Sequence, residues 1–225
     1  VGRIFGRAAE LGAFVRIDME DHPTTDATLA LYRDVRPLNP SSGVVIQAAL
    51  RRSAADIEAL IEERVPVRLC KGAYKEPASV AFTERTDVDR SYVELMRRLL
   101  EAGTNPALAT HDERIIGEAV RFAKERGIER DAFEFQMLYG VRRDLQEQLV
   151  AGGYHVRVYV PYGTEWYPYF MRRLAERPAN VMFILRSLLR EGKRGWSARG
   201  AGGRRRVGSL VPPPDRKSTR LNSSH

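Results

Sequence analysis

The chain has 225 residues and a formal net charge of +8, and its length is sufficient for one α/β domain with a sizeable core. Nine Lys or Arg side chains and one acid lie in residues 192–225, so the rest of the chain is neutral and nucleic-acid binding by a folded face is not expected. Cys70 is the single cysteine, so an intramolecular disulfide is excluded. The sequence shows no signal peptide, and no apolar run approaches the ~20 residues of a membrane span. We therefore expect a cytoplasmic protein that is at most peripheral at the inner face of a membrane.

Six apolar runs, each followed by a helical pattern, predict six βα units. In chain order, the expected strands cover residues 13–18, 43–50, 67–71, 106–110, 133–138 and 156–160. The polar or charged residues that close these runs are Asp18, Gln47, Arg68, His111, Gln136 and Tyr159. Because ligands of parallel sheets bind beyond the carboxyl ends of the strands, we expect a site where these residues meet. The pattern fits either an open doubly wound sheet or a barrel that lacks two of its eight units.

The helical patterns also predict buried faces and starting points. In the helix expected over residues 24–36 and just beyond it, Leu31, Val35 and Leu38 are spaced along one face, which is expected to be buried. Ser53 and Thr110 each precede an acidic residue by three positions, which is the spacing of a capping box at the start of a helix.

Two segments combine charge with features that suit a ligand. Residues 68–74 read Arg-Leu-Cys-Lys-Gly-Ala-Tyr, and a strand that ends in two cations and a glycine can bring positive charge and backbone amides to an anion. The alternative is a glycine turn with two solvated bases. In residues 159–173, Arg173 shares a helix face with aromatic residues, and a buried charge there needs an anionic partner. That partner is either a ligand carboxylate or an acid such as Asp18 or Glu20; the remaining alternative is a solvated pair of arginines.

Several common site types are not supported by the sequence. Asp18 and His111 have no partner at metal-ligand spacing, and the chain has neither a cysteine pair nor an acidic cluster typical of Mg²⁺ sites. The Gly-x-Ser-x-Gly signature of α/β-hydrolases is absent, and no Gly-x-Gly-x-x-Gly follows a strand. The sequence therefore argues against a metal site, a serine hydrolase and a Rossmann dinucleotide domain.

Taken together, six segments resemble the proline dehydrogenase family, in the family's order and over nearly all of residues 10–190. The matching segments are residues 17–20, 45–48, 68–74, 109–111, 133–140 and 159–173. The resemblance implies an α/β fold, a (βα)₈ TIM-like barrel that holds FAD non-covalently at the carboxyl ends of its strands. On that template the six strands correspond to the third to eighth, so the barrel is expected to be incomplete, without its first two units and a lysine that they carry.

The resemblance also implies a domain division and a reaction. Residues 1–191 would form the partial barrel, including helices expected over residues 166–176 and 179–189, and residues 192–225 would form a basic Gly/Arg/Pro-rich tail that is disordered or non-native. The reaction would be oxidation of L-proline to Δ1-pyrroline-5-carboxylate by hydride transfer to FAD, with a quinone as the electron acceptor.

Roles follow residue by residue from the same resemblance. Arg172 and Arg173 would clamp the proline carboxylate, and Arg68 would lie near flavin N5 with Asp18 as its acidic counterpart. The residues implied to line FAD are Met19, Gln47, Arg68, Lys71, Gly72, Ala73, Thr110, His111 and Glu176. Those implied to shape the pocket around the substrate ring are Leu69, Tyr74, Leu138 and Tyr159.

One substitution and two alternatives stand beside this interpretation. Cys70 occupies a position where the family has an apolar β-branched residue, and a small buried thiol can fill that volume.

Because missing strands expose two sheet edges, we expect weak FAD binding and slow or no turnover. The alternatives are a lyase or aldolase that uses Lys71 as a Schiff-base amine, and an inactive barrel fragment whose basic tail binds nucleic acid.

Overall fold

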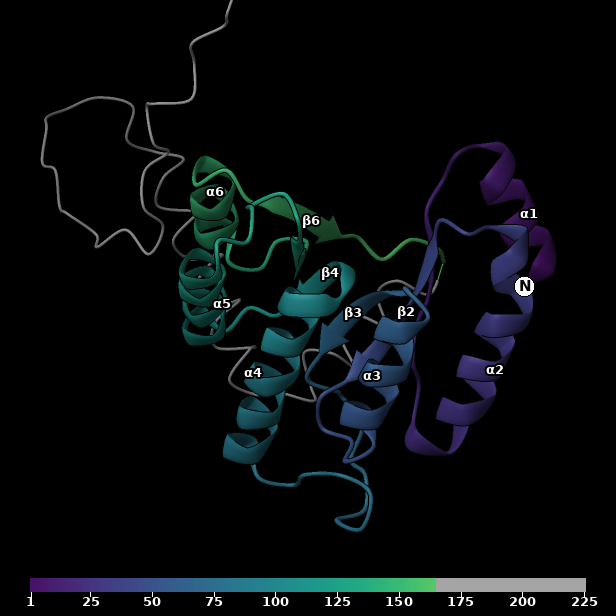
Figure 1. Cartoon of the computed structure of the whole chain (residues 1–225), viewed down its shortest axis with the longest axis horizontal. Helices are drawn as coiled ribbons and strands as arrows, with labels where there is room; N and C mark the ends of the chain where they lie inside the picture. Colours follow the sequence, from purple (N-terminus) through teal and green to yellow (C-terminus); the bar gives the residue numbers. More distant parts are fainter. Residues whose placement is uncertain (165–225) are drawn as a thin grey trace, which may run out of the picture.

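A computed structural model of the chain describes residues 1–164, and the statements that follow concern this part (Figure 1). The strands are β1 Val15–Ile17, β2 Ser42–Gln47, β3 Pro66–Cys70, β4 Thr104–Ala109, β5 Glu134–Leu138 and β6 His155–Tyr159. The α-helices are α1 Gly2–Glu10, α2 Thr25–Val35, α3 Ser53–Glu62, α4 Arg85–Ala102, α5 Glu113–Arg126 and α6 Arg143–Ala151. Two short 3-10 turns, η1 His22–Thr24 and η2 Arg36–Leu38, flank α2.

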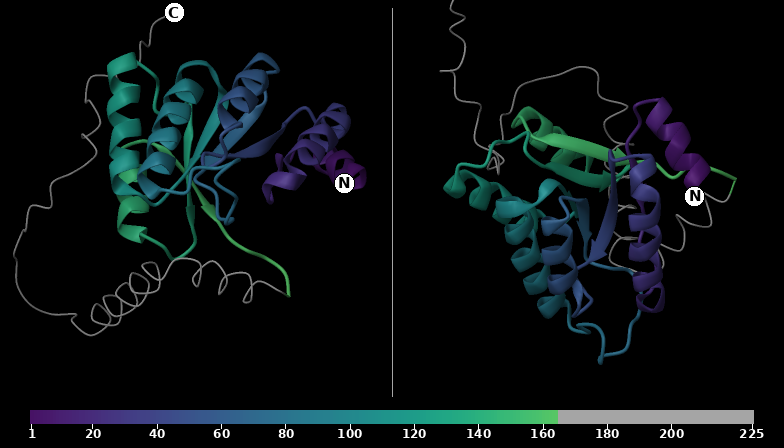
Figure 2. Two further views of the ribbon diagram at one scale, coloured as in Figure 1. Left: turned by 90° about the horizontal axis from the view of Figure 1, so that it is seen from below. Right: turned by 45° about the vertical axis from the view of Figure 1, so that its right-hand side comes forward.

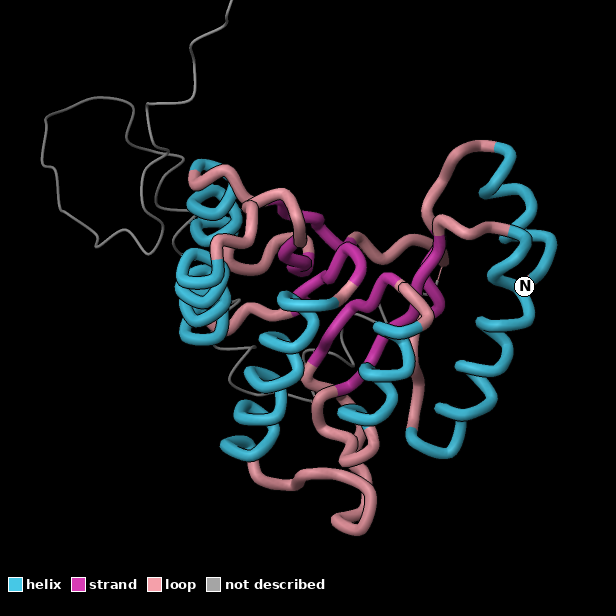
Figure 3. Tube along the Cα trace, viewed as in Figure 1, coloured by secondary structure: helices cyan, strands magenta, loops and turns pink. Residues whose placement is uncertain are grey.

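The strands of the described residues form one parallel sheet in the order β1-β2-β3-β4-β5-β6. The sheet curls, and the helices stand along its outer side (Figures 2 and 3). In a doubly wound sheet the strand order reverses and helices cover both faces. The sequential order and the single row of helices are those of a barrel, so the predicted TIM-like α/β fold with six βα units is confirmed.

The hydrophobic core lies between the strands and the outer helices. Successive side chains of a strand point to opposite faces, so a period of two decides which residues enter this core. Val44 and Ile46 of β2 and Phe135 and Met137 of β5 are buried in it. The polar Gln47, which closes β2, points to the inner side. The helices cover only the outer face of the curled sheet, and polar side chains such as Gln47, Arg68 and Gln136 lie on its inner face.

The predicted face of α2 is confirmed at Val35 and was wrong at Leu31 and Leu38. Leu29, Tyr32 and Val35 form the buried face, while Leu31 is 38% exposed and Leu38 is 50% exposed. Residues three apart on a helix share a face, which places Leu31 on the adjoining side. Leu38 lies in η2, beyond the end of the helix, so the helical period no longer applies to it.

Both predicted capping boxes were also wrong. Ser53 is the first residue of α3 rather than its cap, and its hydroxyl donates a 2.6 Å hydrogen bond to the Gln47 carbonyl oxygen. The N-cap of α5 is Asp112, whose carboxylate accepts from the Arg114 backbone N–H at 3.1 Å. Thr110 instead accepts from the Asp112 N–H, so it shapes the turn before the helix.

Some predictions fall outside the described residues. These are the helices expected over residues 166–176 and 179–189 and the boundary between barrel and tail at residue 191. Among the helices of residues 1–164, none is both long enough and apolar enough to cross a membrane.

The two leucines of α2 provide a matched test of the fold. Leu29→Ala is expected to lower the free energy of unfolding by about 2–5 kcal/mol, because it empties a buried site. Leu31→Ala removes the same atoms from a more exposed position and is expected to change it by about 0.5 kcal/mol or less. Urea unfolding of both variants measures the difference, and equal losses would contradict the assigned faces.

Candidate active site

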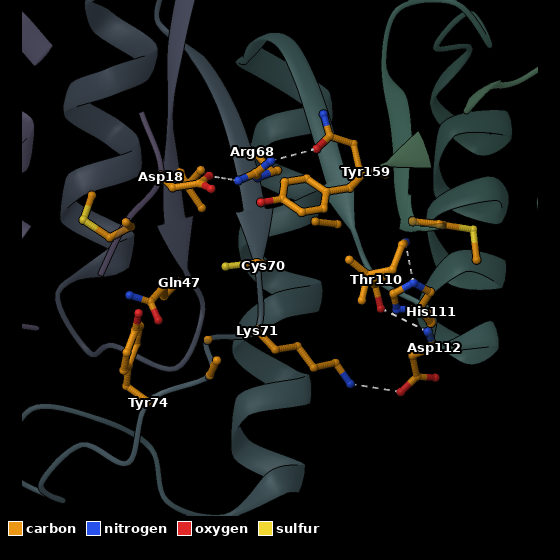
Figure 4. Close-up of a pocket in the computed structure, with 18 of the residues that line it drawn as sticks. Asp18, Gln47, Arg68, Cys70, Lys71, Tyr74, Thr110, His111, Asp112 and Tyr159 are labelled. Carbon is orange, nitrogen blue, oxygen red and sulfur yellow. Dashed lines mark hydrogen bonds and ion pairs between the residues drawn. The ribbon is translucent and has the colours of Figure 1, made fainter. Parts of the chain in front are cut away.

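The inner face of the sheet and the loops beyond its strands enclose a cavity of about 550 Å³ (Figure 4). This volume lies within the range of roughly 300–1,000 Å³ that is usual for small-molecule sites. All six strands or the loops that follow them contribute to its lining. The predicted site residues that line the cavity are Asp18, Met19, Gln47, Arg68, Lys71, Gly72, Ala73, Tyr74, Thr110, His111, Leu138 and Tyr159.

Leu69 requires a correction. It was predicted to shape the substrate pocket, but its side chain is fully buried in the core between the sheet and the helices and does not line the cavity. Arg68 and Cys70 line the cavity instead. The alternation along β3 explains the difference, because neighbours of an inward-pointing residue must point outward. The predicted substrate ligands Arg172 and Arg173 and the predicted cofactor contact Glu176 lie outside the described residues.

Arg68 lines the cavity between Asp18 and Tyr159 (Figure 4). Its side chain is only 14% exposed, and its guanidinium forms an ion pair with Asp18 from the end of β1. On another side, Nη1 donates a 3.3 Å hydrogen bond to Oε1 of Gln136 on β5. The Tyr159 ring of β6 lies with its centroid 5.7 Å from the guanidinium carbon, within the range of a cation–π contact. Side chains from β1, β5 and β6 therefore fix a cation that β3 supplies.

A second set of charges lies next to Arg68, toward the amino ends of the strands. Gln136 Nε2 donates to Glu134 at 2.5 Å, and Arg157 binds both carboxylate oxygens of Glu134 at 2.9 and 3.0 Å. Burial opposes ionisation of Glu134, but the hydrogen bonds from Arg157 and Gln136 outweigh it and the pKa of Glu134 is lowered. Burial, and next the charge of Arg68, lower the pKa of Arg16 to about 10, so Arg16 remains charged at pH 7.

Lys71 occupies the opposite part of the cavity from Arg68. Its Nζ forms ion pairs with Asp89 of α4 and, at 3.0 Å, with Asp112 at the start of α5. Burial would raise the pKa of Asp112, yet the hydrogen bond and charge of Lys71 outweigh this effect and the pKa is lowered. The Lys71 ammonium, which is 11% exposed, is thus held by two carboxylates from different helices.

His111 joins the ends of two neighbouring strands. The backbone N–H of Leu138 donates to Nε2 of His111 at 2.8 Å. An imidazole nitrogen that accepts a hydrogen bond carries no proton, so His111 is neutral and its proton is on Nδ1. This contact orients the ring at the edge of the cavity.

The loops that follow β1 and β3 meet above the cavity, and a glutamate of each loop accepts hydrogen bonds from the other loop. The Tyr74 hydroxyl donates to Glu20, and Gln47 Nε2 donates to the Glu20 carbonyl oxygen at 2.5 Å. In the same loops, His22 contacts Glu76 through its backbone N–H at 2.9 Å and through Nδ1 at 2.7 Å. The loops after β1 and β3 are thereby fastened to each other, which places Tyr74 at the mouth of the cavity.

The chemistry of this lining suits a ligand rich in hydrogen-bond acceptors. Arg68 and Lys71 supply charged donors, and Gln47, Thr110 and His111 add neutral polar groups. Among residues 1–164, no group of three or more His, Cys, Asp or Glu side chains is arranged to hold a metal ion. The site is therefore suited to an organic ligand that has several polar atoms and at least one negative charge.

The sequence pattern did not identify the carboxylates that hold Arg68 and Lys71, apart from Asp18. Asp112 directly follows His111 at a strand end, so its position was a usable signal. Asp89 lies near the start of α4, and nothing in the local sequence pattern indicates that it pairs with Lys71. Glu134 alternates with Gln136 along β5, and the period of two could have assigned both to the inner face.

Comparisons with known proteins point to one family. The family model described as proline dehydrogenase matches residues 1–186. The proline dehydrogenase of Deinococcus radiodurans is 49% identical over 190 residues, which cover 84% of this chain and 61% of that protein. Proline dehydrogenase 2 of Bacillus subtilis is 45% identical over 189 residues, which cover 84% of this chain and 62% of that protein. The chain thus spans about three fifths of the length of these curated relatives.

Solved structures of larger proteins contain a similar fold. Proline utilization A (PutA) from Bdellovibrio bacteriovorus, inactivated by N-propargylglycine, matches with a TM-score of 0.71 and 31% identity over 76% of this chain and 20% of that chain. A variant of PutA from Bradyrhizobium japonicum matches with a TM-score of 0.71 and 25% identity over 83% of this chain and 22% of that chain. The curled sheet therefore corresponds to one part of these longer chains.

The ion pair between Lys71 and Asp112 predicts a pH dependence. A carboxylate whose pKa is lowered by folding stabilises the protein fully above its unfolded pKa of about 3.9, and this contribution is lost as the pH falls through the lower folded value. Asp112→Asn keeps a residue that can cap α5 but removes the charge. We expect the variant to be less stable than the wild type at pH 6, with a difference that shrinks below about pH 4.

Denaturant unfolding between pH 3 and pH 6 measures this dependence, and Asp131→Asn, at an exposed position, is the control. A stability difference between the wild type and Asp112→Asn that does not change with pH would show that charge is not the cause.

Proposed function

The chain belongs to the proline dehydrogenase family, and we propose that it forms the barrel of an enzyme that oxidises L-proline to Δ1-pyrroline-5-carboxylate with FAD as cofactor. The observation that supports this best is Arg68, a nearly buried cation that lines the cavity and is held by Asp18 and Gln136. Because the chain spans about three fifths of its relatives, the activity is proposed for the protein of which this barrel is a part.

The residues present fit FAD. Gly72 has a φ of +102°, and a Cβ at this position would approach Gln47 Oε1 to 3.0 Å and Ala49 Cβ to 3.2 Å, so the chain can run closely past Gln47 only as glycine. Gln47, Lys71, Thr110 and His111 would supply polar contacts to the ring, the ribityl chain or the phosphates. FAD, when bound, supplies the acceptor for the two electrons that leave proline.

In this proposal Arg68 stabilises the negative charge that reduction places on the cofactor. A fixed cation in a site that excludes water is most effective when it does not have to move during the reaction. Asp18 and Gln136 hold the guanidinium in place before any ligand binds. Asp18, which is 50% exposed, would therefore act by orienting Arg68 from the rim of the cavity.

Substrate, acceptor and domain division belong to the same proposal. Arg172 and Arg173 would bind the proline carboxylate as a charge-assisted pair, and Tyr74, Leu138 and Tyr159 would surround the pyrrolidine ring. A quinone is the proposed electron acceptor, reached by a cytoplasmic protein with peripheral membrane contact. Residues 1–191 would form the barrel domain and residues 192–225 a separate tail.

The geometry disfavours the Schiff-base alternative. A lysine that attacks a carbonyl needs a free amine lone pair, and such lysines are usually desolvated or placed beside another cation. Lys71 is instead an ammonium that donates to Asp89 and Asp112. Ion pairs with Asp89 and Asp112 suit a lysine that binds a ligand through its charge or connects α4 and α5 to the cavity.

FAD binding tests the proposal directly. We expect the purified chain to quench the fluorescence of added FAD in a saturable way, although weakly because β1 and β6 are unpaired on their outer edges in residues 1–164. Arg68→Met is expected to weaken binding at least tenfold, which corresponds to about 1.4 kcal/mol, since hydrogen bonds to charged groups contribute about 1.5–3 kcal/mol.

Arg98→Met serves as the matched control, because Arg98 pairs with Glu58 on the outer helices and lies away from the cavity. Saturable binding that is lost in Arg68→Met and kept in Arg98→Met supports the proposal. The absence of any FAD binding by the wild-type chain, or equal affinities of the wild type and Arg68→Met, would contradict it.

A further inference from the structure

A chain of four side chains runs across the inner face of the sheet from β6 to β3. Arg157 donates to both carboxylate oxygens of Glu134, at 2.9 and 3.0 Å. Gln136 donates through Nε2 to Glu134 Oε1 at 2.5 Å and accepts through Oε1 from Arg68 at 3.3 Å. Glu134 is not part of the cavity lining, and its hydrogen-bonded connection to the cavity is Gln136, which lines it.

The donors and acceptors in this chain can be arranged in one way only. An ionised carboxylate accepts hydrogen bonds and a guanidinium donates them, so neither end can exchange its role. The Gln136 amide has one end of each kind. When the NH₂ group of Gln136 points toward Glu134, its carbonyl oxygen faces Arg68. If the amide were flipped, the NH₂ group would face the Arg68 guanidinium, which is also a donor, and the carbonyl oxygen would face the Glu134 carboxylate, which is also an acceptor. Glu134 therefore determines which end of the amide Arg68 meets.

The surroundings show why Arg68 needs this support. Arg16 lies near Arg68, and the mutual repulsion contributes to the lowered pKa of Arg16. Arg16 is itself held by the carbonyl oxygens of Val44, at 3.1 Å, and Pro66, at 3.4 Å. On the other side, Asp18 lies at the half-exposed rim and attracts Arg68 from one direction only. Gln136 on β5 supplies a second acceptor, so the guanidinium is held from β5 as well as from Asp18.

We infer that Glu134 is a positioning residue: it fixes the orientation of the Gln136 amide and thereby holds the Arg68 guanidinium in its place in the cavity. The effect on the cofactor rests on the proposed function, in which Arg68 acts on FAD. The orientation of Gln136 does not depend on that function and can be measured without a ligand.

The first experiment is nuclear magnetic resonance on the ¹⁵N-labelled wild-type chain without FAD. The Gln136 side-chain NH₂ signals are assigned by their loss in Gln136→Met. Glu134→Gln keeps the shape of the side chain and removes the charge, and it is expected to speed solvent exchange of the Gln136 NH₂ at least tenfold. Glu147→Gln, on the exposed side of α6, is expected to leave that exchange unchanged. Unchanged exchange in Glu134→Gln would overturn the inference.

The second experiment measures the consequence for the cofactor. With FAD bound, Glu134→Gln is expected to lower the midpoint potential in the same direction as Arg68→Met, by about 30 mV for a tenfold change in the two-electron equilibrium. The exchanged pair Glu134→Gln with Gln136→Glu again offers Arg68 an acceptor from β5, because the carboxylate is then at position 136 and the amide at position 134 can donate to it. It is expected to restore the potential.

The exchanged pair separates positioning from a purely structural role. If Glu134 served only as the partner of Arg157, the exchange would not restore the potential, and that result would overturn the inference. If the chain does not bind FAD, the proposed function fails, while the amide exchange in the free protein still decides whether Glu134 orients Gln136.

Discussion

The site depends on one constraint: Arg68 projects from the middle of a curled parallel sheet into an interior where every charge needs a partner. An unpaired charge in such a place is costly, and other strands supply partners for the Arg68 guanidinium. Asp18 reaches Arg68 from β1, and Gln136 and Tyr159 reach it from β5 and β6. The curvature of the sheet, the positions of the inward-pointing residues and the cavity thus depend on each other.

The same requirement explains how the rest of the lining is organised. Lys71 is paired with carboxylates from α4 and α5, and Tyr74 is fastened to Glu20 across two loops. These contacts join segments that lie 18 to 54 positions apart in the chain. The polar groups are therefore in place before a ligand arrives, which is the arrangement that electrostatic stabilisation of a reaction requires.

The sequence revealed the units of the fold and the strand ends, but not the contacts between them. Apolar runs with a polar end identified Gln47, Arg68 and Tyr159, because burial leaves a strong local pattern. Leu69 was misplaced because resemblance outweighed the period of two, which alone puts it opposite Arg68. Asp89 could not be found, since its pairing with Lys71 arises only when α4 packs on the sheet. The predictions of helix starts were wrong for the same reason, because the partner lies outside the helix. The Ser53 hydroxyl donates to the Gln47 carbonyl oxygen at the end of β2 and does not cap α3.

A crystal structure of the chain, determined with and without FAD, is the most direct test of the claim that Arg68 is a preorganised cation in a flavin site. The account predicts that Arg68 contacts Asp18 and Gln136 in both structures and that FAD occupies the cavity lined by Gln47, Lys71 and His111. Density for FAD elsewhere, or an Arg68 side chain that leaves both partners in the free protein, would contradict it.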